Sequence, residues 1–146
     1  MGWVREEYED RLRSHQGGVN AAERQFEEAA ARRWQELVAQ IEADIDEYRQ
    51  HGGAASFTRV SDIEVRVTDS ESALAVNVRA DLPGHAIHYD FGSRNDRVAS
   101  PVGGIFSIRQ SRSGRTELYS ADERVHSEDA RRMLLEPILF PNEKAA

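Results

Sequence analysis

The chain has 146 residues and no cysteine. That absence excludes disulfide bonds, thiolate zinc sites and a cysteine nucleophile. No apolar run approaches the roughly 20 residues that a membrane-spanning helix needs. The N-terminal residues are charged at once and lack the apolar centre of a signal peptide. We therefore expect a cytoplasmic protein with no membrane partner.

Positive charge is also scarce. The formal net charge is −7, and residues 1–50 hold seven arginines against twelve acidic residues. Proteins that bind nucleic acid need a surplus of cationic groups to displace counterions from phosphates, so we expect no nucleic-acid partner. Only Lys144 among the basic residues is a lysine, a bias typical of GC-rich bacterial coding sequences.

Residues 2–50 have the pattern of two amphipathic helices. Val4, Tyr8 and Leu12 lie four residues apart and predict a short first helix. Gly17-Gly18 predicts a break, because two consecutive glycines favour a turn.

Asn20 then restarts the helix in a capping box with Glu23. The second helix is predicted to be about 30 residues and roughly 45 Å long, whereas six strands span only about 29 Å. We therefore expect it to overhang the sheet, to pack along the first helix or to meet a second copy. Its apolar stripe comprises Phe26, Ala30, Trp34, Leu37, Val38, Ile41, Ile45 and Tyr48.

After Gly53 the apolar period changes from about 3.6 to two, which predicts strands. The expected strands cover residues 54–60, 63–68, 74–79, 85–91, 105–110 and 116–119. Residues 92–104 are predicted to form a long loop, either a binding loop or one that contains an edge strand near 97–100. A final helix over 127–136 is expected to be capped by Ser127 and to end or kink at Pro137.

This order of elements is typical of an α+β fold. We expect a single domain over residues 1–146 with a helical part at 2–50, an antiparallel sheet of about six strands at 54–120, and the C-terminal helix.

His88 and Asp90 are the weak catalytic candidates. They share one face of a strand, since side chains repeat every two residues. Such a pair could form a general base with its orienting carboxylate, or two metal ligands, but no third group is identifiable. The alternative is that both lie on the solvent face, opposite Ile87, Tyr89 and Phe91. No metal or cofactor is implied.

Five arginines gather between residues 94 and 115, where Asp96 is the one acidic residue. Because guanidinium groups match carboxylates and phosphates, they could form an anion-binding or acidic-partner patch. Alternatively, they pair with the acidic helices of the same chain or are solvated. The set is Arg94, Arg97, Arg109, Arg112 and Arg115.

Two functions remain open. The first is a non-catalytic interaction or binding protein that self-associates, as a homodimer or other homo-oligomer, through its long helix. Phe26, Trp34, Leu37 and Ile41 are the predicted contact residues. The second is a small-molecule or enzymatic site in a pocket between a curved sheet and its helices.

Overall fold

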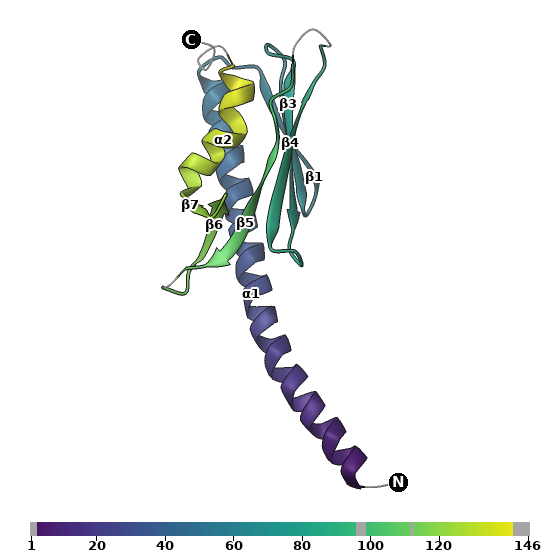
Figure 1. Cartoon of the computed structure of the whole chain (residues 1–146). Coiled ribbons are helices and arrows are strands. Elements are labelled where there is room, and N and C mark those ends of the chain that lie inside the picture. Colours follow the sequence, from purple (N-terminus) through teal and green to yellow (C-terminus); the bar gives the residue numbers. More distant parts are fainter. Residues whose placement is uncertain (1–2, 96–98, 112, 142–146) are drawn as a thin grey trace.

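A computed structural model describes residues 3–95, 99–111 and 113–141, without the side chains of 6–23. It confirms the α+β class: a long helix, α1 (Trp3–Gln50), precedes an antiparallel sheet, and a shorter helix, α2 (Ser127–Leu139), follows the sheet (Figure 1).

The sheet has seven strands where about six were predicted. Strands adjacent in sequence are adjacent in the sheet, so it is a simple antiparallel meander. The strand missed by the sequence pattern is the last, because it has only three residues. The strands are β1 (Ala55–Ser61), β2 (Glu64–Asp69), β3 (Leu74–Asp81), β4 (Ala86–Ser93), β5 (Gly104–Gln110), β6 (Thr116–Ser120) and β7 (Glu123–Val125).

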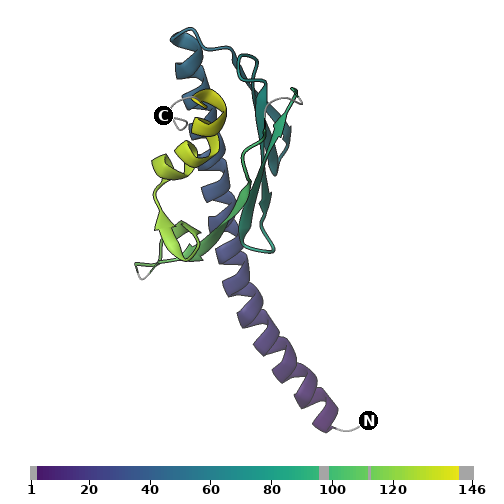
Figure 2. The same cartoon turned by 45° about the horizontal axis from the view of Figure 1, so that its top comes forward.

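Both helices pack against one face of the sheet. α1 contacts β1 and β6, strands far apart in the sheet order, whereas α2 contacts β2 and β3. The sheet therefore curves around the helices, as Figures 1 and 2 show. Alternation sends Val65, Val76 and Phe106 into the core. The buried residues of α1 are those of the predicted stripe from Ala30 to Ile45.

The structure differs from the predicted helix break at Gly17-Gly18. α1 runs through both glycines as one 48-residue helix, so Asn20 lies inside it rather than at its start. A helical glycine costs only about 1 kcal/mol relative to alanine. Two glycines therefore weaken a helix without forcing it to end, since the residues on both sides favour helix.

At 1.5 Å per residue α1 is about 72 Å long. Its first part extends past the sheet in both views, and no described strand or helix lies beside it (Figures 1 and 2). Phe26 marks the boundary, because it packs against the core and contacts His85 in the turn between β3 and β4. We call residues 3–24 the arm. The overhang was predicted for a second helix that starts at Asn20; in the structure most of the overhanging part consists of residues assigned to the separate first helix.

α2 is longer than the predicted 127–136 and continues through Pro137 to Leu139. His126, not Ser127, occupies the N-cap position, and no side chain caps the helix. The Ser127 hydroxyl instead hydrogen-bonds Gln40 on α1. Contact with α1 has replaced the local capping bond.

The segment between β4 and β5 is a loop wherever the structure describes it. Residues 99–103 are not a strand, and the rest of the predicted edge strand, 97–98, lies outside the described residues. Gly103 lies against β4: a Cβ placed on it would come within 2.2 Å of the Tyr89 carbonyl oxygen. Glycine is required here because of this close approach.

Candidate functional site

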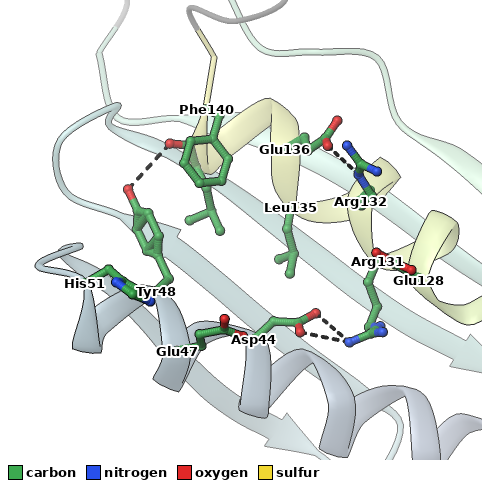
Figure 3. A pocket seen from close by; sticks show the side chains of 11 residues that line it. Asp44, Glu47, Tyr48, His51, Glu128, Arg131, Arg132, Leu135, Glu136 and Phe140 are labelled. Atoms are coloured by element: carbon green, nitrogen blue, oxygen red, sulfur yellow. Dashed lines mark hydrogen bonds and ion pairs between the residues drawn. The ribbon is translucent and has the colours of Figure 1, made fainter.

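A groove of about 520 Å³ lies between the C-terminal part of α1 and α2. Figure 3 shows Asp44 and Arg131 pointing toward one another across it, with Tyr48 and Phe140 at one end. Its lining combines aromatic and aliphatic side chains with acids and arginines. The α1 side supplies Asp44, Glu47, Tyr48 and His51, and the α2 side supplies Glu128, Arg131, Arg132, Leu135, Glu136, Leu139 and Phe140.

Both arginines of this groove are paired with carboxylates of the same chain. Arg131 Nη1 donates to Asp44 Oδ1 at 2.8 Å and Oδ2 at 2.9 Å, and Arg132 Nε donates to Glu136 Oε1 at 2.6 Å. Burial raises the pKa of Asp44, and the Arg131 charge opposes that shift. Burial, then the charges of Asp69 and Glu71, raise the pKa of Tyr48.

Such pairing leaves the groove little chemistry. Both guanidinium groups already hold carboxylates, and the Tyr48 hydroxyl donates to the Leu139 carbonyl at 3.4 Å. Among its described lining residues no serine or threonine stands beside a base, as nucleophilic catalysis requires. The groove is best described as a helix–helix contact that couples α1 to α2.

A second cavity of about 420 Å³ lies where β5 separates from β4, between the core face of the sheet and α2. Every residue that lines it is uncharged, and Tyr89 supplies its one side-chain hydroxyl. Val102, at its margin, is 91% exposed. The lining consists of Leu74, Tyr89, Phe91, Ala99, Pro101, Val102, Met133, Pro137 and Pro141.

Tyr89 is fixed by stacking. Its ring lies 5.0 Å from that of Phe106 at 27° and meets Phe91 edge-on at 6.0 Å. Gly104 leaves room for the phenol, because a Cβ there would lie 2.6 Å from the hydroxyl oxygen. Burial raises the pKa of Tyr89. The cavity therefore offers a rigid aromatic wall with one neutral hydroxyl, which suits an uncharged ligand.

The arm is the third feature. Its first residues are exposed, with Trp3 at 74% and Val4 at 61%. The side chains at positions 8 and 12 of the predicted stripe lie outside the described ones. Trp3 and Val4 are thus large apolar side chains exposed at the projecting end of α1.

His88 and Asp90 lie on β4 with their side chains on the outer face, opposite Ile87 and Tyr89. His88 pairs in register with Arg79, and Asp90 with Asn77. Neither residue lines the groove or the apolar cavity. The structure therefore brings the pair together on the side of the sheet that the helices leave uncovered, away from both hollows.

The described members of the arginine set are not gathered at one place. Arg94 follows the end of β4, whereas Arg109 and Arg115 flank the β5–β6 turn at the opposite end of the strands. Arg109 Nη2 pairs with Asp122 Oδ1 at 2.7 Å, and its guanidinium lies 5.2 Å from the Tyr119 ring centroid. Arg97 and Arg112 lie outside the described residues.

The predicted contact residues on α1 serve the chain's own core. Trp34, Leu37 and Ile41 are 2%, 2% and 0% exposed, and the Trp34 indole donates to the Asp62 carbonyl at 2.8 Å. Phe26 is half-buried at the edge of the sheet. These side chains cover β-strands of the same chain, which leaves three of them no surface for a partner.

Sequence reasoning missed the apolar cavity and the Asp44–Arg131 pair. The cavity draws on β3, β4, the following loop, α2 and the segment after it, so no local pattern could reveal it.

Within the described residues no group of three His, Cys, Asp or Glu side chains could hold a metal ion. No helix in that part of the chain has the length and apolar character required to cross a bilayer.

Comparison with known proteins found no match among protein-family models, curated proteins or solved structures.

Proposed function

We propose that this chain is a non-catalytic interaction protein that self-associates through its arm. The observation that supports this most directly is that α1 continues beyond the sheet (Figures 1 and 2), over residues whose sequence repeats the apolar spacing. Seven positions of α1 pack against or within the core, namely 26, 30, 34, 37, 41, 45 and 48. The same three- and four-residue spacing places positions 4, 8, 12 and 19 in phase with them along the arm.

Helix stability supports a partner for the arm. Most helical stability in proteins comes from packing of an apolar face rather than from propensity. The two glycines at positions 17 and 18 add a cost of about 1 kcal/mol each relative to alanine. Contact with a partner along the arm would offset this cost, which the sheet of this chain does not offset.

Charge also permits self-association. Residues 3–24 carry four arginines and five acidic residues, whereas residues 25–50 carry three arginines and seven acidic residues. The arm is thus close to neutral on an acidic protein. Two arms can approach without the like-charge repulsion that the rest of α1 would produce.

Sedimentation velocity on the whole chain tests this function. Leu12→Asp places a charge on the stripe and is expected to convert a self-associated species into a monomer. Ala21→Asp adds the same charge about 180° around the helix from Leu12 and should leave the species unchanged. A wild-type chain that stays strictly monomeric across a wide concentration range would contradict the proposal.

The apolar cavity supports a second candidate function, binding of an uncharged hydrophobic small molecule. Its volume of about 420 Å³ lies within the usual range for ligand pockets. N-phenyl-1-naphthylamine, a neutral probe whose emission rises in apolar surroundings, should bind saturably. Met133→Trp would fill the cavity and abolish the signal, and Ile105→Trp, on the outer face, would not. An equal signal from both variants would exclude this site.

A further inference from the structure

Two polar groups at the apolar cavity lack their usual hydrogen-bond partners within the described part of the chain. The first is the Tyr89 hydroxyl. Tyr48, which also packs against the core, donates its hydroxyl to the Leu139 carbonyl. The Tyr89 hydroxyl, by contrast, has no hydrogen-bond partner among the residues that the structure describes. Because Tyr89 lines the cavity, a bound molecule can supply that partner.

The position of the Tyr89 hydroxyl is fixed by its neighbours. The ring stacks on Phe106 and meets Phe91 edge-on. The hydroxyl oxygen lies close to Gly104, where an added Cβ would come within 2.6 Å of it. Burial raises the pKa of Tyr89, so the hydroxyl keeps its proton and can donate a hydrogen bond. The cavity therefore has a donor held in one place.

Pro137 creates the second group, a backbone acceptor on α2. Proline has no N–H, so the Met133 carbonyl, one turn earlier, lacks its regular helix hydrogen bond. Met133 and Pro137 both line the cavity. Because each helix carbonyl points toward the amide four residues later, the Met133 oxygen lies between these two lining residues. The α2 wall thus presents an acceptor.

The rest of the lining is poor in donors and has no charge. Three of the chain's four prolines lie in it, and none of them has a backbone N–H; these are Pro101, Pro137 and Pro141. Tyr89 supplies the one side-chain donor of the lining. A carboxylate or ammonium group would find no opposite charge here, and burying it unpaired would be unfavourable.

We infer that the cavity binds a neutral alcohol or phenol with an apolar body, whose hydroxyl accepts a hydrogen bond from Tyr89 and donates one to the Met133 carbonyl. This rests on the second candidate function, binding of an uncharged small molecule, and adds the polar group by which the ligand is recognised. A hydroxyl both donates and accepts. A pure hydrocarbon of the same shape would leave both cavity groups unpaired.

Three neutral probes of similar size separate the two contacts. 2-Naphthol donates and accepts, 2-methoxynaphthalene only accepts, and 2-methylnaphthalene does neither. Their affinities for the whole chain are measured at neutral pH by displacement of N-phenyl-1-naphthylamine. Met133→Trp, which fills the cavity, should abolish binding of all three probes.

Tyr89→Phe removes the donor and keeps the ring. It should weaken 2-naphthol and 2-methoxynaphthalene by about two- to tenfold, the usual effect of one hydrogen bond, and leave 2-methylnaphthalene unchanged. Tyr119→Phe is the matched control. The Tyr119 ring contacts the Arg109 guanidinium and does not line the cavity, so this variant should bind all three probes as the wild type does.

Pro137→Ala restores an N–H that takes up the Met133 carbonyl. It should weaken 2-naphthol alone by about two- to tenfold, because the other two probes have no donor to lose. Pro83→Ala makes the same change in the turn between β3 and β4, outside the cavity, and should have no effect on any probe.

Other outcomes separate the inference from the function beneath it. If all three probes bind and each variant changes their affinities by the same factor, the two hydroxyl contacts are absent. The inference then fails while binding of uncharged molecules in the cavity stands. If no probe binds the wild type saturably, both fail.

Discussion

The ring of Phe26 lies 4.4 Å from the imidazole of His85, edge to face at 65°. This contact joins α1 to the turn between β3 and β4. It also marks where the helix leaves the sheet and the arm begins. His85 adopts a positive φ of 51°, which a non-glycine residue rarely accepts without compensating contacts. The boundary of the arm is therefore a specific packed contact.

A double-mutant cycle at this boundary should detect that contact. Phe26→Ala is expected to lower the free energy of unfolding by about 1–2 kcal/mol, below the usual cost of a buried phenylalanine because the residue is only half-buried. With His85→Ala as the second change, the coupling energy should be about 0.5–1.5 kcal/mol, typical of an aromatic pair. Urea unfolding measures all three variants. Strict additivity would show that the rings do not stabilise one another.

Gly103 should tolerate no side chain. A methyl group there would lie 2.2 Å from the Tyr89 carbonyl oxygen and 2.9 Å from the Asp90 Cα, and backbone cannot move aside as a flexible side chain can. We expect Gly103→Ala to cost about 1–3 kcal/mol, the usual range for overpacking. Gly92→Ala is the matched control, because a Cβ added there would meet no atom within 4 Å. Equal thermal stability of the two variants would contradict the close approach.

The Asp44 carboxyl predicts a defined pH dependence of stability. Burial raises its folded pKa above the ordinary value of 3.8, although Arg131 opposes the shift. At a pH between the ordinary pKa, which applies to the unfolded chain, and the higher folded pKa, Asp44 keeps its proton in the folded chain and has released it in the unfolded chain. The contribution of this group to the free energy of unfolding is therefore greatest below pH 3.8 and declines as the pH rises through the folded pKa.

The difference in unfolding free energy between the wild type and Asp44→Asn isolates this contribution. It should fall as the pH rises from below 3.8 toward neutrality. Arg131→Met removes the opposing charge, so the folded pKa of Asp44 should rise further and the total decrease in this free-energy difference should become larger. A difference that grows with pH would mean that the ion pair outweighs burial and that the folded pKa is lowered instead.

The sequence pattern predicts the local elements well because their periodicity is set by burial on one side. Val65, Val67, Val76 and Val78 alternate in strands that the structure contains, and the apolar spacing of α1 matches its buried face. Gly17-Gly18 misled the prediction, since glycine propensity is a small energy and not a stop signal. Ser127 misled it because a tertiary partner, Gln40, competes for the hydroxyl.

Features that join distant segments could not be predicted. Asp44 and Arg131 are 87 residues apart and meet only because α2 packs beside α1. The curvature that opens the apolar cavity between Tyr89 and Met133 depends on how seven strands twist around a helix. Alternation with apolar neighbours placed His88 and Asp90 on one strand face and offered the solvent side for both, where the structure has them, but sequence alone could not choose between that side and a site.

The most direct test of the central claim, that the arm is the surface through which copies assemble, is amide hydrogen exchange of the whole chain at high and low protein concentration. We predict that amides of residues 5–24 are protected at high concentration and lose that protection on dilution, while amides of β2, β3 and the buried part of α1 remain unchanged. Arm amides whose exchange is the same at every concentration would contradict the claim.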